Sequence, residues 1–249
     1  MAILELNALR KAFGGLIATD DVTISVAADA VHGLIGPNGT GKTTLFSLIT
    51  GFYRADTGSV RFDGMDVTGL TTSARARRGL VRTFQSNLLF NDQTVLENVA
   101  SGALISRPRH ALDWLYERKV DRVKANKAVR EILDFCRLSD RADVAARDLS
   151  HGQQRVLGIA VALAARPRLL LLDEPFTGMT AREKDELVTM IQAIRARGAT
   201  IILVEHDMRA VMRLCDRITV LNFGKVLAEG TPEQVRRHPD VMAAYLGTA

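Results

Sequence analysis

The sequence predicts an α/β fold with a mostly parallel central sheet, an N-terminal antiparallel β region and an inserted α-helical lobe. Three observations predict it. Short strands alternate with helical segments over much of the chain, and the first third is rich in strands. From about residue 94 to residue 146, apolar residues recur at helical spacing. The 249 residues are enough to bury a full core as one large domain, alone or with a lobe.

The first third of the chain is predicted to consist mainly of strands. Apolar alternation and β-branched residues predict four of them, at residues 3–6, 22–26, 31–35 and 59–62. A helix is expected over residues 41–50, where Gly51 ends it, and a short helix over residues 72–78.

The second half of the chain alternates between strands and helices. The run LLLLD, residues 169–173, follows Arg166 and Pro167, is too short for a helix and is apolar on both faces, as a central parallel strand is. The other expected elements are a strand at 80–83, a helix with a stripe of Leu187, Met190, Ile191 and Ile194 that ends at Gly198, a strand at 200–204, a helix at 207–214, a strand at 218–221 and a turn at 222–225.

Composition and charge exclude several classes of protein. The chain is 47% apolar and 24% charged, which is typical of a globular protein and not of a disordered one. Its longest uncharged apolar run, residues 156–165, is far shorter than the roughly 20 residues of a membrane span, and no secretory signal is visible. Cys136 and Cys215 lack metal or redox spacing, so we expect two buried, reduced thiols.

The net charge of +5 and the pI near 9.5 permit an acidic partner without requiring one. The densest basic cluster consists of Arg75, Arg77, Arg78 and Arg82. Because no aromatic residues are interleaved with these arginines to stack on bases, we interpret the cluster mainly as a solvated surface and expect no nucleic acid partner.

The segment GPNGTGKTT matches the phosphate-loop pattern, since Gly36 is followed after four residues by Gly41, Lys42 and Thr43. Glycines let backbone N–H groups surround phosphates, while Lys42 neutralises them and the Thr43 hydroxyl ligates Mg²⁺. The position of the segment between a predicted strand and a predicted helix argues against a glycine-rich loop without function. The predicted nucleotide-binding residues of this loop are Gly36, Pro37, Asn38, Gly39, Thr40, Gly41, Lys42, Thr43 and Thr44.

Two carboxylates and a histidine lie at or just after the ends of predicted strands. Asp173 ends the LLLLD strand and is placed to hold Mg²⁺, and the adjacent Glu174 can polarise an attacking water molecule. His206 follows the strand at residues 200–204, at the same edge of the sheet. The alternative is surface charge for the acids and a structural role for the histidine. The buried strand that leads directly to the acids favours the functional interpretation.

A second candidate anion site lies in LSHGQQR. Its Ser150 and Gly152 stand directly before the apolar run at residues 156–165, where a helix is expected to start. Free N–H groups at a helix start, a serine hydroxyl and a glycine that allows close approach together favour anion binding.

Four segments, GPNGTGKTT, LSHGQQR, LLLLDEP and VEHD, resemble in order and spacing the ATP-binding subunits of ABC transporters over essentially the whole chain. Other phosphate-loop enzymes lack the LSxGQ element. The segments KAFGGL, GLVRTFQ and EHDM, and a tail of EGTPEQV followed by HPDVMAAYLG, are most similar to the ATPases of branched-chain amino acid importers. The resemblance implies a single P-loop NTPase domain over residues 1–249, with an α/β core in 1–85 and 166–249 and a helical subdomain in 86–165.

The resemblance also implies roles for individual residues. Phe13 would stack on adenine, Glu174 would be the catalytic base, and His206 would contact the γ-phosphate. Gln85 would sense Mg²⁺ and the attacking water and would link the site to the helical lobe. The residues that would bind the γ-phosphate of an ATP held by a second subunit are Ser150, Gly152 and Gln153. Two such chains would therefore close head-to-tail around two ATP molecules.

The partners that the resemblance implies are a second ATPase subunit, identical or related, and two transmembrane permease subunits, with an extracytoplasmic binding protein reached indirectly. The chain would lie at the cytoplasmic face of the inner membrane. The apolar residues Leu88, Leu89 and Phe90 either pack inside the lobe or receive a permease helix. Alternative functions are an exporter or lipid-transport ATPase, a soluble ABC protein acting on nucleic acid or ribosomes, and a phosphate-loop kinase.

Three positions depart from the usual pattern of the family. His151 replaces the first glycine of LSGGQ, and Thr40 replaces an alanine of the phosphate loop, a change expected to leave the loop intact. Thr180 replaces an aspartate that communicates across the dimer, which would fit a heterodimer with a related ATPase.

Overall fold

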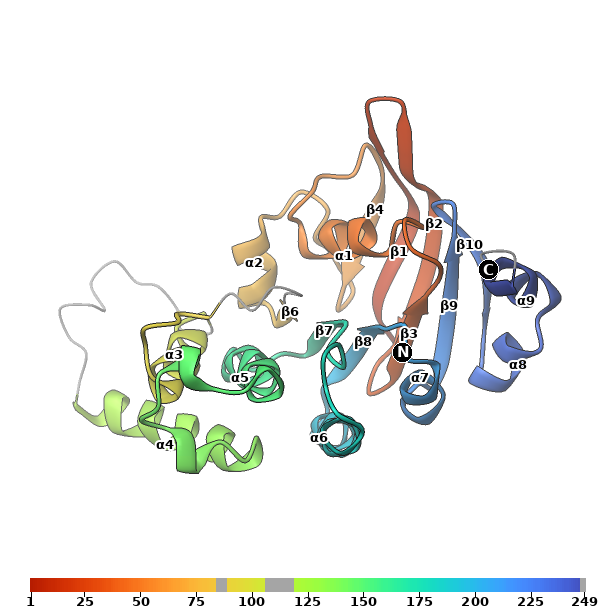
Figure 1. Cartoon of the computed structure of the whole chain (residues 1–249). Coiled ribbons are helices and arrows are strands. Elements are labelled where there is room, and N and C mark those ends of the chain that lie inside the picture. Colours follow the sequence, from red (N-terminus) through yellow and green to blue (C-terminus); the bar gives the residue numbers. More distant parts are fainter. Residues whose placement is uncertain (84–88, 106–118, 247–249) are drawn as a thin grey trace.

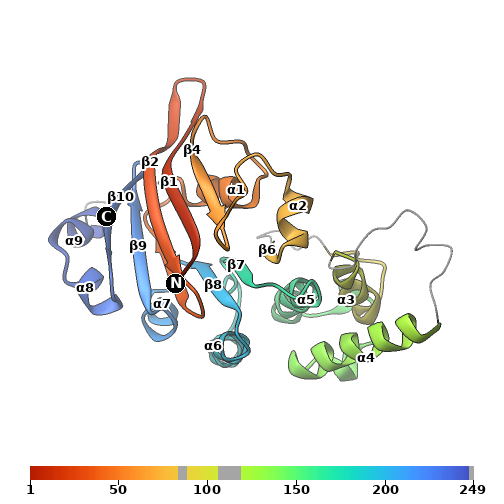
Figure 2. The same ribbon diagram turned by 180° about the vertical axis from the view of Figure 1, so that it is seen from behind.

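The computed structural model describes residues 1–83, 89–105 and 119–246, which form two sheets and a group of helices (Figures 1 and 2). The larger sheet has the strand order β10-β9-β3-β8-β7-β6, and the smaller one has the order β2-β1-β4-β5. The larger sheet consists of β3 (Val31–Ile35), β6 (Leu80–Arg82), β7 (Leu169–Asp173), β8 (Thr200–Val204), β9 (Arg217–Asn222) and β10 (Lys225–Gly230). The smaller sheet consists of β1 (Ala2–Phe13), β2 (Leu16–Ala27), β4 (Thr57–Phe62) and β5 (Met65–Asp66).

The larger sheet is parallel except at one edge, where β10 pairs antiparallel with β9. The smaller sheet is antiparallel throughout its described strands. In the larger sheet Asp173, the last residue of β7, pairs with Val204, the last residue of β8. Because parallel strands end at the same edge, the segments that follow β3, β6, β7 and β8 are brought together there.

The described helices are α1 (Lys42–Thr50), α2 (Thr72–Arg77), α3 (Val95–Ala103), α4 (Lys119–Phe135), α5 (His151–Ala164), α6 (Ala181–Ala196), α7 (Met208–Leu214), α8 (Pro232–Arg236) and α9 (Pro239–Leu246). Helix α1 lies between the two sheets, because its buried Phe46 shares one core with Leu4 of β1 and Leu171 of β7. Helices α6 and α7 cover the opposite face of the larger sheet through residues such as Ile191 and Val211.

Helices α3, α4 and α5 form a lobe beside the sheets (Figures 1 and 2). Their buried residues, among them Val99, Leu133 and Leu157, make a hydrophobic cluster of their own. Helix α5 also contributes Ile159 to the core of the larger sheet, so it joins the lobe to the sheet. The division at residues 85 and 166 stays a prediction. Within the described residues, every helix is too short or too polar to cross a lipid bilayer.

The predicted fold class is confirmed, while several elements differ from the expectation. Strand β1 continues to Phe13 instead of ending at residue 6, because register shifts between Leu6 and Leu9 interrupt the alternation on which the prediction rested. Strand β10 and helices α8 and α9 were not predicted. Cys136 and Cys215 are buried free cysteines, as expected, and burial raises the pKa of each thiol to about 12.

The interpretation of the arginine cluster as a solvated surface is wrong for Arg75 and Arg82. Arg75 is only 2% exposed, and its guanidinium donates to the carbonyl oxygens of Leu48 and Ile49 at 2.8 and 2.6 Å. Because the last carbonyls of a helix lack partners within it, Arg75 caps the C-terminal end of α1. Arg82 lies in the candidate site described below.

Candidate functional site

The phosphate loop, residues 36–44, runs from the end of β3 into the first turn of α1. Gly36 and Gly41 have φ angles of 150° and 99°, which residues with a side chain rarely adopt. A Cβ atom at Gly36 would overlap the carbonyl oxygen of Leu221, and one at Gly41 would overlap that of Ala18. The path of this loop therefore requires glycine at both positions.

Lys42 places its ammonium group inside the curve of this loop. Its Nζ atom donates to the carbonyl oxygens of Gly36 and Pro37 at 2.7 and 2.8 Å. Burial lowers the pKa of Lys42, and the nearby carboxylates of Glu174 and Asp173 oppose that shift. A buried ammonium group is a strong electrostatic partner for a phosphate.

Thr40 supports the same loop from within. Its hydroxyl donates to the carbonyl oxygen of Pro37 at 2.9 Å, and its own carbonyl accepts from the N–H of Gly224 at 3.1 Å. The threonine therefore ties the loop to itself and to the β9–β10 turn. The residues at the tip of the loop, Asn38 and Gly39, are exposed.

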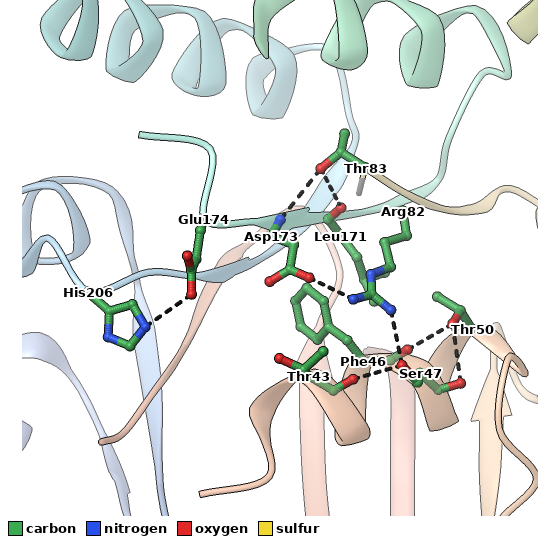
Figure 3. Close-up of polar contacts among 10 residues, drawn as sticks. All are labelled: Thr43, Phe46, Ser47, Thr50, Arg82, Thr83, Leu171, Asp173, Glu174 and His206. Atoms are coloured by element: carbon green, nitrogen blue, oxygen red, sulfur yellow. Dashed lines mark hydrogen bonds and ion pairs between the residues drawn. The ribbon is translucent and has the colours of Figure 1, made fainter. Parts of the chain in front are cut away.

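Glu174 and His206 meet at the edge of the larger sheet (Figure 3). The N–H of Glu174 donates to the carbonyl of Val204 at 2.9 Å, which fixes the backbone after β7 against the end of β8. The Oε1 atom of Glu174 lies 3.1 Å from Nε2 of His206. The side chains of Glu174 and His206 are 20% and 42% exposed, so both reach solvent as a ligand would require.

A third residue at this edge, Glu205, was not singled out from the sequence. Its buried carboxylate accepts from the N–H groups of Phe176, His206 and Asp207, at 2.9, 2.8 and 3.1 Å. Glu205 thereby joins the segment after Glu174 to the segment that carries His206. An acidic residue directly after an apolar strand was the signal that could have identified it.

Asp173 is held by Arg82, at the end of β6 (Figure 3). Nη2 of Arg82 lies 2.6 Å from Oδ2 of Asp173, and the two side chains are 8% and 2% exposed. Nη1 of Arg82 donates to Oγ of Ser47 at 3.2 Å. The Ser47 hydroxyl in turn donates to the carbonyl of Thr43 at 2.8 Å, which links the acid to the helix that follows the phosphate loop.

The second candidate anion site lies at the N-terminus of α5. The Ser150 hydroxyl oxygen accepts from the N–H of Gln153 at 3.2 Å, and the Gln153 side chain accepts from the N–H of Ser150 at 3.0 Å. This reciprocal capping fixes the first turn of the helix. Among the described residues, no hydrogen bond or ion pair joins Ser150, Gly152 or Gln153 to the phosphate loop.

The first turn of α5 packs against the segment that leads into α6. A Cβ at Gly152 would overlap the carboxylate of Glu183, and one at Gly178 would lie 2.9 Å from Nδ1 of His151. Glu183 also caps α6 together with Thr180, whose hydroxyl accepts from the N–H of Glu183 at 3.3 Å. His151 and Thr180, two of the departures from the family pattern, therefore lie on the two sides of one contact.

Phe13 lies at the end of β1 and is 42% exposed. Its ring meets that of Tyr53 edge-on, with ring centres 5.1 Å apart. Gln85 and Leu88 lie outside the described residues. Leu89 packs against the core of the lobe, whereas Phe90 is 55% exposed, so the two described residues of the apolar patch differ in environment.

Comparison with known proteins identifies the family that this chain resembles in sequence. A sequence model of the ABC transporter family matches residues 19–177, and one described as branched-chain amino acid ATP-binding cassette transporter matches residues 225–249. The chain is 42% identical over 255 residues to the high-affinity branched-chain amino acid transport ATP-binding protein BraF of Pseudomonas aeruginosa, with 99% of this chain and 98% of the relative covered. It is 39% identical over 255 residues to LivG of Escherichia coli, with the same coverage.

Two further likenesses cover nearly the whole chain. An ATP-binding cassette of an ABC transporter, solved in its ADP conformation, superposes with a TM-score of 0.87 at 33% identity and covers 99% of each chain. The lipopolysaccharide export system ATP-binding protein LptB of Haemophilus influenzae is 34% identical over 247 residues, with 99% of this chain and 98% of the relative covered.

Proposed function

Since the chain belongs to the ABC transporter family and is an ATP-hydrolysing transport subunit of it, we propose that it powers the import of branched-chain amino acids through separate membrane permeases. The match to the branched-chain model at residues 225–249 carries this proposal, because it falls on the C-terminal part that the general family model does not reach. The identities of 42% and 39% to BraF and LivG, against 34% to LptB, point the same way.

We propose that the phosphate loop binds the phosphates of ATP together with Mg²⁺. The Thr43 hydroxyl and the Asp173 carboxylate offer the oxygen ligands that Mg²⁺ prefers, and Gln85 is the third proposed ligand. No group of three or more His, Cys, Asp or Glu side chains within the described ranges could hold a metal ion. Mg²⁺ is usually bound by few protein oxygens together with nucleotide phosphates, which such a sparse donor set fits. The ion would neutralise charge on the phosphates when bound.

For hydrolysis we propose that Glu174 is the base that orients and deprotonates the attacking water, with His206 contacting the γ-phosphate. The 3.1 Å contact between the two side chains supports this assignment, since it places a carboxylate and an imidazole at one point of the sheet edge. Phe13 is the proposed platform for adenine, because its ring is partly exposed and is held edge-on by Tyr53.

We propose that Ser150, Gly152 and Gln153 bind the γ-phosphate of ATP held by a second ATPase subunit, identical or related. The Ser150 oxygen accepts from Gln153, which leaves its hydroxyl hydrogen to donate to an anion. Permease subunits and an extracytoplasmic binding protein would complete the assembly, with this chain at the cytoplasmic face of the inner membrane.

Replacement of Glu174 by glutamine tests the two-sided site. The variant is expected to bind ATP, to hydrolyse it at least a hundredfold more slowly, and to form a dimer in ATP when measured by light scattering after gel filtration with its partner ATPase present. The matched control adds Ser150→Ala, which should bind ATP equally well but stay monomeric. A Glu174→Gln protein with full ATPase activity in the reconstituted transporter would refute the catalytic assignment.

Transport identifies the cargo. Proteoliposomes that contain the assembled transporter should accumulate labelled leucine, isoleucine or valine only when ATP is present, and not when Glu174 is replaced by glutamine. The 34% relative LptB makes lipid export the second candidate. Extraction of labelled lipopolysaccharide from vesicles, without amino acid uptake, would establish that candidate and overturn the import proposal.

A further inference from the structure

The buried ion pair between Arg82 and Asp173 lies at the centre of the site but belongs to no proposed step above. Both side chains are almost completely withdrawn from solvent, at 8% and 2% exposure, and the shortest distance between them is 2.6 Å. A carboxylate buried to this degree requires a partner. Arg82 supplies it with a planar, permanently charged guanidinium, whose geometry fixes the orientation of the acid.

The same guanidinium is linked to both described residues that are proposed to hold Mg²⁺, directly to Asp173 and through Ser47 to Thr43. Nη2 of Arg82 binds Oδ2 of Asp173, and Nη1 donates to Ser47 at 3.2 Å. The Ser47 hydroxyl then donates to the carbonyl oxygen of Thr43 at 2.8 Å. Figure 3 shows this chain of contacts, with Asp173 between Arg82 on one side and Glu174 and His206 on the other. One cation therefore connects the carboxylate of one proposed ligand to the backbone of the other.

Packing of the strands does not depend on this ion pair. Strand β6 is already joined to β7 by backbone pairing, in which Arg82 is opposite Leu171, and the N–H of Thr83 donates to the carbonyl of Leu171 at 2.9 Å. Thr83 also accepts from the N–H of Asp173 at 3.5 Å. These backbone contacts thus fix the position of the Asp173 main chain, and the Arg82 guanidinium fixes the orientation of its carboxylate.

We propose that Arg82 is a positioning residue for the metal site: it holds one oxygen of Asp173, leaves the other for the Mg²⁺ shell, and keeps Asp173 in register with Thr43 through Ser47. This inference rests on the proposed binding of Mg²⁺ with ATP. Groups that orient metal ligands from behind change metal affinity without touching the ion. Arg82 would therefore set how much Mg²⁺ the site requires, while the phosphate loop alone sets how well it binds metal-free ATP.

The experiment compares Arg82→Met, which removes the charge, with Arg82→Lys, which keeps it, in the full-length protein. ATP affinity is measured in EDTA and across a Mg²⁺ titration, and Mn²⁺ bound in the presence of ATP is measured by electron paramagnetic resonance. In Arg82→Met the half-saturating Mg²⁺ concentration should rise about tenfold or more, with metal-free ATP affinity changed less than about twofold. Arg82→Lys should recover part of the metal affinity, because one ammonium can hold Asp173 but cannot reproduce the fork.

Two further variants make the test specific. Ser47→Ala leaves the ion pair in place and cuts only the link to Thr43, so it should raise the half-saturating Mg²⁺ concentration by a smaller factor; it also carries the test if Arg82→Met fails to fold. Arg168→Met removes an exposed pair with Asp63, in which the Arg168 side chain is 56% exposed, and should leave the metal titration unchanged.

An unchanged or lower Mg²⁺ requirement in Arg82→Met would overturn the inference, because the guanidinium would then be neutral toward the metal or compete with it. An equal loss of metal-free and metal-dependent ATP affinity would also overturn it, since the residue would then act on the whole fold. If the wild-type protein bound ATP without any Mg²⁺ effect, the proposed metal site itself would be wrong. That result is read from the wild type alone, so the two failures are distinguishable.

Discussion

Removal of the Glu205 side chain should loosen both segments that carry the proposed catalytic groups. Glu205 accepts three backbone N–H groups, from Phe176 on the segment after β7 and from His206 and Asp207 on the segment after β8. In Glu205→Ala all three donors lose their acceptor at once. The bond to Phe176 is buried, whereas those to His206 and Asp207 are only partly buried and can regain water.

The size of the effect follows from these environments. A buried donor left without an acceptor costs about 1–3 kcal/mol, and the partly buried ones cost less. Summed over the three donors, we therefore expect Glu205→Ala to lower the free energy of unfolding by about 3–4 kcal/mol. Glu205→Gln keeps one carbonyl acceptor and should lose about half as much. Against a total stability of about 5–15 kcal/mol, both variants should still fold.

Urea denaturation measures the loss, and amide hydrogen exchange at residues 176, 206 and 207 locates it. Exchange at these three positions should speed up more than at the strands β7 and β8 themselves. Glu186→Ala is the matched control, because Glu186 pairs with Arg182 on the surface of α6, where the exposed side chains contribute less than about 1 kcal/mol. A loss below about 1 kcal/mol in Glu205→Ala, or unaltered exchange at the three amides, would refute the reasoning.

Two further predictions concern protonation and the phosphate loop. Burial lowers the pKa of His32 to about 4, so between pH 6.5 and 4 the unfolded chain binds a proton at His32 and the folded chain does not. The free energy of unfolding should therefore fall by about 3 kcal/mol as the pH drops through that range. His32→Gln should flatten this pH dependence in urea denaturation, and an unchanged slope would contradict the assignment. Gly41→Ala should weaken ATP binding at least about tenfold in calorimetry. The control Gly198→Ala, also at positive φ but with open space around it, should leave ATP binding unchanged and lower the free energy of unfolding by about 1 kcal/mol. An ATP affinity of Gly41→Ala equal to that of the wild type would show that the loop tolerates a side chain.

The sequence was sufficient to predict which chain segments gather at the site. Gly36 directly follows β3, Asp173 is the last residue of β7, and His206 lies two residues after the end of β8. Parallel strands present their ends at one edge of a sheet whatever lies between them in the chain. The glycine spacing of the phosphate loop also predicts the path of its backbone. Gly36 and Gly41 stand at the two positions where the φ angle is one that residues with a side chain rarely adopt.

The charged residues inside the core could not be predicted in this way. Arg82 and Asp173 are 91 positions apart, and Arg75 finds the end of α1 27 residues away. In sequence, such arginines resemble the exposed Arg77 and Arg78 beside them. Their burial is decided by which partner the fold brings near, because a charge is withdrawn from water only where another group compensates it. The sequence around each arginine does not indicate which distant group that partner will be.

The donors of the two proposed phosphate-binding sites are held in place by the protein before any nucleotide arrives. Lys42 has three N–H donors, of which the carbonyls of Gly36 and Pro37 take two, so one remains for a phosphate oxygen. Ser150 is fixed by its capping contacts with Gln153 and likewise retains one donor. Groups that need no reorganisation on binding stabilise charge more than mobile ones do. On the proposed arrangement, each subunit supplies one such half, and closure of the dimer would bring both to the same γ-phosphate.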